Sequence, residues 1–201
     1  MALDMRTALT VAGSDSIGGA GIQADVKAMS AVGVHAATVI TALTAQNTTG
    51  VNGILPVSEE FIKAQLEAVL KDSDIKAIKT GMLYSAEIVG TVADILEDHE
   101  APLVVDPVMV ATSGAKLLAD DAVEVLVQEL FPLAEVITPN IPELSVLTGQ
   151  EIADEVAFQG AAEHLAAQAG VNVLAKGGHS AGEASDLLVM ADGKLAFDGE
   201  P

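Results

Sequence analysis

The sequence predicts an α/β protein in which a mostly parallel sheet carries helices on both faces. Short apolar and β-branched segments alternate along the chain with segments whose apolar residues recur at helical spacing. Half of the 201 residues are hydrophobic but only 2% are aromatic, so Ala, Val, Leu and Ile must fill a sizeable core. Residues 34–43 are largely apolar or β-branched, as expected for a strand that is covered on both faces.

The N-terminal half predicts strands and helices in alternation. The apolar segment 7–13 (TALTVAG) predicts a buried strand that ends at a glycine, and residues 22–32 have helical apolar spacing. The strand 34–43 follows. Ser58, two glutamates and the segment FIKAQLEAVL together are typical of a helix with a serine N-cap. Residues 75–81 predict a strand that runs into a glycine turn.

The C-terminal half continues the alternation. Helical spacing and short β-branched runs predict helix 85–98, strand 103–105, helix 119–130, strand 135–138, a helix that begins near Pro142, helix 153–169 and strand 171–176. Residues 186–190 and 194–197 predict a hairpin that turns at Asp192-Gly193. There is no linker, repeat or low-complexity tract, so we expect residues 1–201 to form a single domain.

Polar or glycine-rich clusters follow the predicted strands. In sheets of this kind a ligand binds outside the carboxyl ends of the strands, so we expect these clusters to converge on one rim. They are Gly13-Ser14-Asp15 with Gly18 to Gly21, Ala45-Gln46-Asn47, Gly81-Met82, Asp106, Asn140 to Glu143, and Lys176 to His179. Several clusters at one rim indicate a binding site more strongly than any one of them does.

The glycine-rich segment 18–21 allows two interpretations. It would let the backbone approach a ligand ahead of a helix N-terminus, or it is simply a tight turn from strand to helix. It is neither a Walker A loop nor a clean dinucleotide fingerprint. Asp25 lies one turn into the helix. On its own it is best interpreted as an exposed carboxylate, although it could also accept a hydrogen bond from a polar substrate.

Three residues at the rim have side chains suited to a small ring or a metal. Gln46 can donate and accept hydrogen bonds at once, as the edge of an aminopyrimidine requires, or it belongs to an ordinary polar loop. Met82 would form an apolar wall for a flat ring, or it fills the core. Asp106 ends an apolar strand, where it would bind a metal, orient a reacting hydroxyl or cap the strand.

The remaining candidates would handle a phosphate and its counter-ion. Glu143 lies three residues after Asn140 at a helix start, where it would hold Mg²⁺ through water, cap the helix, or do both. Lys176 ends a buried strand, a costly position for a cation unless it meets an anion, so we favour a phosphate contact. Lys79 could instead extend from its strand toward solvent.

The charge of the chain excludes several classes of partner. The net charge is −20, with 29 acidic and nine basic residues, so nucleic acid and anionic membranes would be repelled. A phosphate ligand would need backbone N–H groups, a metal ion or one of the few lysines. There are no cysteines, which removes disulfides and thiol nucleophiles. We find no signal peptide or apolar membrane span, and expect a cytoplasmic protein.

Several of these segments together resemble one enzyme family. The segment ALTVAGSDSIGGAGIQADVKAMSAVGVHAATVITALTAQNTTGV is similar to the N-terminal signature of the hydroxymethylpyrimidine/phosphomethylpyrimidine kinases. IKTGML, VVDPVMVATSG, VITPNIPELSVLTG and VLAKGGH followed by DLL continue the resemblance in the family's order. It covers residues 8–198.

The resemblance implies a ribokinase-like three-layer αβα sandwich. Its implied reaction is ATP-dependent phosphorylation of 4-amino-5-hydroxymethyl-2-methylpyrimidine, its monophosphate, or both, in thiamine biosynthesis. The implied site has Gln46 recognising the pyrimidine with Asp25, Ala20, Met82 and Gly13 around it, Asp106 and Glu143 organising Mg²⁺, Asn140 near the phosphates, and Lys176 on the phosphates of ATP. A homodimer is also implied.

Two departures from the family pattern qualify these expectations. Ile17 is unusual beside Gly18 and would alter the loop over the pyrimidine. The family's Gly-Thr-Gly segment, which supplies the catalytic base and anion hole, is expected beyond Pro201 together with the C-terminal helices. We therefore expect no catalytic residue within the chain and poor activity. A pyridoxal-type vitamin kinase and a non-catalytic pyrimidine-binding module stay open as alternatives.

Overall fold

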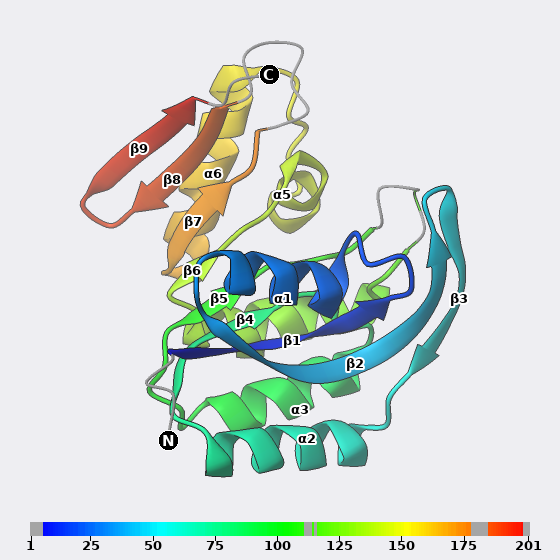
Figure 1. The fold of residues 1–201 in the computed structure, drawn as a ribbon. Helices are drawn as coiled ribbons and strands as arrows, with labels where there is room; N and C mark the ends of the chain where they lie inside the picture. Colours follow the sequence, from blue (N-terminus) through cyan, green and yellow to red (C-terminus); the bar gives the residue numbers. More distant parts are fainter. Residues whose placement is uncertain (1–5, 111–113, 115, 178–184, 199–201) are drawn as a thin grey trace.

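The central feature of the fold is a mostly parallel sheet (Figure 1). The computed structural model of the protein describes residues 6–110, 114, 116–177 and 185–198. Within these residues the strands form one nine-stranded sheet in the order β3-β2-β1-β4-β5-β6-β7-β8-β9. The strands are β1 (Thr7–Asp15), β2 (His35–Asn47), β3 (Gly50–Pro56), β4 (Ile75–Thr80), β5 (Leu103–Val105), β6 (Val136–Ile137), β7 (Asn172–Ala175), β8 (Ser185–Met190) and β9 (Gly193–Asp198). Strands β2, β1, β4, β5, β6 and β7 run parallel, so their carboxyl ends lie at one edge.

Helices cover both faces of this sheet. They are α1 (Gly21–Ala31), α2 (Glu59–Asp72), α3 (Ala86–Leu96), α4 (Asp120–Val125), the π-helical turn η1 (Leu126–Leu130), the 3₁₀ turn η2 (Phe131–Leu133), α5 (Ile141–Thr148) and α6 (Glu155–Ala169). Helix α1 packs on β1 and β2 from one face, while α2 and α3 lie on the opposite face (Figure 1). The predicted α/β sandwich is thereby confirmed. None of the described helices is long and apolar enough to cross a membrane.

Small aliphatic side chains fill the core, as the composition predicts. Leu9 and Val11 of β1 point to the same face as Ile78 of β4, where they pack in one cluster with Val89 and Val92 of α3. All five side chains are buried. The alternate residues of β1 and β4 point instead toward α1, which brings Thr10 and Lys79 beneath that helix. Thr10 and Lys79 therefore lie on the face that carries the site.

Most predicted elements are present, and two features differ. Strand β3 was not predicted, since Gly50–Pro56 contains Gly, Asn and Pro; in the structure it is largely exposed. It is a strand because it pairs antiparallel with β2 across a turn. The expected helix 119–130 begins as α4 but ends in the π-helical turn η1. The predicted cap is confirmed, since Ser58 accepts a hydrogen bond from the backbone N–H of Phe61.

Candidate functional site

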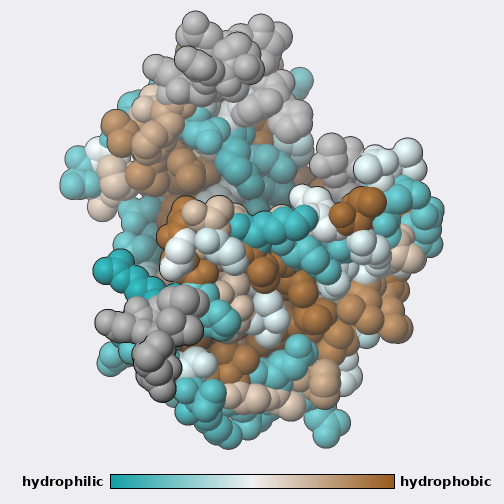
Figure 2. Space-filling view, viewed as in Figure 1, coloured by the Kyte–Doolittle hydropathy of each residue, from teal (hydrophilic) through white to brown (hydrophobic). Residues whose placement is uncertain are grey.

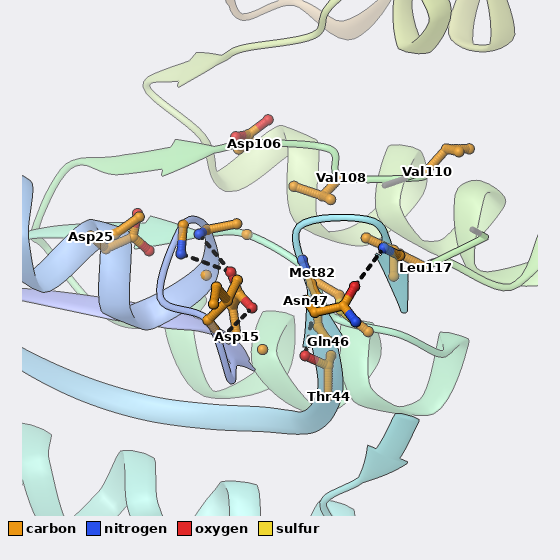
Figure 3. Close-up of a pocket in the computed structure, with 18 of the residues that line it drawn as sticks. Asp15, Asp25, Thr44, Gln46, Asn47, Met82, Asp106, Val108, Val110 and Leu117 are labelled. Atoms are coloured by element: carbon orange, nitrogen blue, oxygen red, sulfur yellow. Dashed lines mark hydrogen bonds between the residues drawn. The ribbon is translucent and has the colours of Figure 1, made fainter. Parts of the chain in front are cut away.

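A cavity of about 580 Å³ opens at the carboxyl ends of the parallel strands. Its walls come from the loop after β1, the start of α1, the hairpin between β2 and β3, and the segments that follow β4 and β5. Six of the nine predicted site residues line it, namely Gly13, Ala20, Asp25, Gln46, Met82 and Asp106. Figure 3 shows Asp25 on one side of this cavity, Gln46 and Met82 toward the other, and Asp106 between them along the upper edge of the view.

The loop after β1 is held by the side chain of Asp15. Its Oδ2 accepts hydrogen bonds from the backbone N–H groups of Gly19 and Ala20, both at 2.9 Å, and its Oδ1 accepts one from Ile17 at 3.1 Å. The carbonyl oxygen of Asp15 accepts from Gly18. The N–H groups of this glycine-rich loop are therefore satisfied internally. Of the two interpretations offered above, the structure favours the tight turn over an anion-binding loop.

Asp25 points toward the sheet and the cavity instead of toward solvent. Its carboxylate forms an ion pair with Lys79, whose Nζ lies 3.1 Å from Oδ1 and 3.0 Å from Oδ2. The hydroxyl of Thr10, on the neighbouring strand β1, donates to Oδ2 at 2.5 Å. The interpretation of Asp25 as an exposed helix carboxylate is wrong, as is the expectation that Lys79 extends into solvent. Lys79 itself lines the cavity.

Gln46 and Met82 are both fixed by a threonine. The hydroxyl of Thr44 lies 3.1 Å from Oε1 of Gln46, which leaves the amide N–H groups of Gln46 available to a ligand. The hydroxyl of Thr41 donates to the carbonyl oxygen of Met82 at 2.6 Å. A Cβ atom at Gly13 would lie 3.1 Å from Sδ of Met82, so the glycine lets the thioether pack against the backbone of β1. These contacts give the cavity one polar edge and one apolar wall.

The other three predicted residues form a second group beside Asp106. Nζ of Lys176 lies 3.0 Å from Oδ1 of Asp106. The backbone of Lys176 is bridged to that of Asn140, and its N–H donates to Pro139. Asn140 and Glu143 form a capping box at the start of α5, in which each side chain accepts from the other's backbone N–H at 2.9 Å. The capping role proposed for both residues is thus present.

Glu143 is only 4% exposed, and this burial has an electrostatic consequence. Desolvation raises the pKa of its carboxyl above the ordinary value, and the nearby charge of Asp106 raises it further. The hydrogen bond from the backbone of Asn140 and the charge of Lys176 act in the opposite direction. Asp106, Glu143 and Lys176 therefore interact electrostatically, although Glu143 and Lys176 do not line the cavity itself.

The donor set beside the cavity suits Mg²⁺ that is held mainly by a bound ligand. Among the described residues there is no group of three or more His, Asp or Glu side chains that could hold a metal ion by itself. Mg²⁺ typically keeps several waters and uses only one or two carboxylates together with phosphate oxygens. Asp106 with Glu143 meets that requirement, so these residues fit a metal ion that arrives with a nucleotide.

The fold and this cleft define the class of the protein. A large, mostly parallel sheet with a ligand-sized cavity at its carboxyl edge is the arrangement of the ribokinase-like α/β proteins. Within that class, the chain belongs to the phosphomethylpyrimidine kinase family, whose model matches residues 15–200.

Individual relatives agree with this assignment. The hydroxymethylpyrimidine/phosphomethylpyrimidine kinase of Haemophilus influenzae is 51% identical over 196 residues, which cover 95% of this chain and 73% of the relative. The crystal structure of phosphomethylpyrimidine kinase from Clostridium difficile superposes with a TM-score of 0.88 at 45% identity, covering 97% of this chain and 85% of that one. Bacillus subtilis pyridoxal kinase in complex with ADP has a TM-score of 0.87 at 32% identity, covering 98% and 75%.

Sequence reasoning missed three residues that shape the cavity. Asp15 was noted only as part of a cluster, but it organises the whole loop. Thr44 lies inside an apolar strand and was passed over, although it lines the cavity and contacts Gln46. Lys79 was interpreted only as a side chain that could extend toward solvent. Its surroundings gave one signal that was overlooked, since it is one of only nine basic residues and stands in an apolar strand.

Proposed function

We propose that the cavity binds 4-amino-5-hydroxymethyl-2-methylpyrimidine, or its monophosphate, and that ATP with Mg²⁺ binds beside it for phosphoryl transfer. The observation that carries this proposal is that Gln46, Met82 and Asp25 line the same cavity as Asp106. Asp106 in turn is paired with Lys176. One continuous cleft thus has groups suited to a polar aromatic ring and groups suited to a triphosphate.

The pyrimidine end of the cleft would recognise the ring by shape and hydrogen bonding. In our proposal the amide N–H groups of Gln46 donate to a ring nitrogen, and Met82 covers one face of the ring. Asp25 accepts a hydrogen bond from an N–H or O–H group of the substrate. Ala20 has a small side chain, so the flat ring can approach the backbone of the loop after β1, while Gly13 leaves the space in which Met82 packs beside the ring.

The phosphate end would combine a metal ion with one lysine. Asp106 and Glu143 would hold Mg²⁺, which when bound would neutralise charge on the phosphates of ATP, with Asn140 close to the same phosphates. Lys176 would place its ammonium group against the phosphates. With the hydroxymethylpyrimidine as substrate, the hydroxymethyl oxygen forms a bond to the γ-phosphorus while the bond from that phosphorus to the bridging oxygen of ADP breaks, and the hydroxyl proton is released. With the monophosphate as substrate, an oxygen of its phosphate group forms that bond instead. We propose no described residue as the catalytic base.

Calorimetry on the purified chain tests the proposal directly. Titration with the hydroxymethylpyrimidine should give one site per chain, and Mg²⁺ with a non-hydrolysable ATP analogue should give a second. Phosphorus NMR of the protein with ATP, Mg²⁺ and the pyrimidine would then report product formation. Lack of binding of either ligand at millimolar concentration would refute the proposed site.

The pyridoxal-type kinase is the rival that the structural neighbours support best. The same calorimetric titration with pyridoxal discriminates the pyrimidine kinase from the pyridoxal kinase. The pyrimidine should bind more tightly than pyridoxal if Gln46 forms hydrogen bonds with the polar edge of an aminopyrimidine. Tighter binding of pyridoxal would replace our substrate assignment. Binding of the pyrimidine without any binding of the nucleotide would instead favour the non-catalytic binding module.

We further propose that two copies of the chain associate. Leu43 and Leu55 are register partners on β2 and β3, and both are exposed. Figure 2 shows apolar side chains on the side of the molecule that β2 and β3 form, at the right of the view. Light scattering after gel filtration should give twice the mass of 20.4 kDa.

The cytoplasmic location, the single-domain organisation and the lack of nucleic-acid binding stay predictions.

A further inference from the structure

Two side chains of the sheet hold Asp25 from below. Lys79 is the fifth residue of β4, and its side chain is 23% exposed beneath α1. Thr10 of β1 is fully buried and reaches the same carboxylate. Neither residue belongs to the pyrimidine or phosphate groups proposed above. Both nevertheless donate hydrogen bonds to the carboxylate of Asp25, which lines the cavity.

The geometry leaves Asp25 with one acceptor position. An ionised carboxylate offers about four lone-pair positions, two on each oxygen. Oδ2 receives both the ammonium of Lys79 and the hydroxyl of Thr10, whereas Oδ1 receives only the ammonium of Lys79. The remaining position is therefore on Oδ1. A ligand that meets Asp25 in the cavity would bring a single N–H or O–H donor.

The backbone near Lys79 is adapted to this contact. A Cβ atom at Gly81 would lie 2.9 Å from Nζ of Lys79 and 3.1 Å from Cβ of Ala12. A glycine at this position therefore leaves space for the ammonium group close to the strand. The side chain of Lys79 can therefore lie between the sheet and α1, where its Nζ reaches both carboxylate oxygens of Asp25.

We propose that Lys79 and Thr10 are positioning residues for substrate recognition, acting through Asp25. They hold the carboxylate turned so that Oδ1 is offered to the pyrimidine. This inference rests on the proposed function, because it concerns the ring-binding end of that same cleft. Charge-assisted hydrogen bonds with fixed direction are stronger than neutral ones, so loss of the positioning should be measurable as loss of substrate affinity.

Lys79→Met tests the proposal, with Lys76→Met as the matched control. Both lysines lie on β4, but Lys76 pairs with Asp74 where the two side chains are 58% and 78% exposed. Lys79→Met should weaken pyrimidine affinity by about tenfold to a hundredfold, whereas the affinity for the ATP analogue should change by less than about twofold. The control should change neither affinity. Equal losses of both affinities in Lys79→Met would indicate a general structural role and overturn the proposal.

A double-mutant cycle asks whether Lys79 acts through Asp25. In an Asp25→Asn background, adding Lys79→Met should cause less than about a twofold further loss of pyrimidine affinity. That double variant also removes both charges, so it does not leave a carboxylate unpaired if the single variant folds poorly. Independent, additive losses would overturn the inference.

Thr10 provides the second arm of the test. Thr10→Val removes the hydroxyl at nearly constant size and should weaken pyrimidine binding by about fivefold or more, while Thr10→Ser should restore it. No restoration by serine would contradict the role of the hydroxyl. Failure of the unaltered protein to bind the pyrimidine would remove the proposed function and this inference together. Normal binding by Lys79→Met would remove this inference alone.

Discussion

Nζ of Lys176 lies 3.0 Å from Oδ1 of Asp106, although 70 residues separate the two in the chain. They meet because β5 and β7, which are parallel and separated by β6, end at the same edge of the sheet. The pair is partly accessible, with 37% of the lysine side chain and 24% of the aspartate side chain exposed. A phosphate that approached this edge could therefore compete with Asp106 for the lysine.

Substitution of Lys176 should separate nucleotide binding from pyrimidine binding. Lys176→Met removes the cation and should weaken the affinity for Mg²⁺ with an ATP analogue by about tenfold or more, because hydrogen bonds to phosphate oxygens from a charged donor are strong. Pyrimidine affinity should stay within about twofold of the unaltered protein. Calorimetry of both ligands measures the difference.

Lys194→Met is a suitable control for that variant. Lys194 also forms an ion pair, at 2.5 Å with Glu163, but it lies on β9 far along the sheet and both side chains are about half exposed. Its loss should leave both affinities unchanged. An unchanged nucleotide affinity in Lys176→Met would show that the lysine only neutralises Asp106.

Substitution of Gln46 should have the opposite selectivity. Gln46→Met keeps the length of the side chain but removes its donors and acceptor, so the polar edge of the ring would lose its partner. The pyrimidine dissociation constant should rise by about tenfold to a hundredfold, which corresponds to one unmade hydrogen bond. Gln128→Met, at an exposed position on η1, is the control. Equal effects of the two substitutions would contradict the role of Gln46.

The sequence predicted which residues lie near the carboxyl edge of the sheet because each carries a local signal, although β1 and β2 continue to Asp15 and Asn47, past the predicted ends at residues 13 and 43. Gly13, Gln46, Gly81 and Asp106 all follow apolar β-branched runs, and parallel strands place such residues at one edge without further information. Strand β3 had no such signal. Its pairing with β2 is a tertiary contact, which stabilises a segment of poor β-propensity.

The hydrogen-bond partners within the site were not predictable in the same way. That Asp15 binds its own loop, while Asp25 binds Lys79 at a separation of 54 residues, depends on where side chains point in the folded chain. Residue type and spacing could identify both as candidates but could not assign their partners. The resemblance to a family supplied Asp25, yet gave no reason to examine Lys79 or Thr10.

Gly21 should be far more sensitive to substitution than another glycine of similar backbone conformation. Its φ is +57°, and a Cβ atom there would lie 2.2 Å from the carbonyl oxygen of Gly13. Gly33 has φ of +77°, but a Cβ atom there would meet no other atom within 4 Å. Gly33→Ala should therefore cost only the left-handed strain, about 1–2 kcal/mol.

Gly21→Ala adds a steric clash to the same strain and should cost well above about 2 kcal/mol in the free energy of unfolding. Urea denaturation of both variants measures the difference. Because Gly13 lines the cavity, the surviving folded fraction of Gly21→Ala should also bind the pyrimidine less tightly. Similar stability losses in the two variants would mean that the close approach of Gly21 to Gly13 is not required by the fold.

The buried carboxyl of Glu143 should give the metal-free protein a specific dependence of stability on pH. Burial raises its pKa above the ordinary value of 4.5, so over the pH range between 4.5 and the raised pKa the folded state binds more protons than the unfolded state. The contribution of Glu143 to stability is then fully present below pH 4.5 and is lost as pH rises through the raised pKa. Glu143→Gln removes the titration, while its amide oxygen can still accept from the backbone N–H of Asn140.

Urea denaturation at a series of pH values, with a chelator present, should therefore show the unaltered protein losing stability relative to Glu143→Gln as pH increases. Taking the difference between the two proteins cancels the titration of groups that they share. Glu97→Gln, at the exposed end of α3, controls for the removal of one carboxylate from a protein of net charge −20. A difference that grows in favour of the unaltered protein with rising pH would mean that the attraction of Lys176 outweighs desolvation at this site.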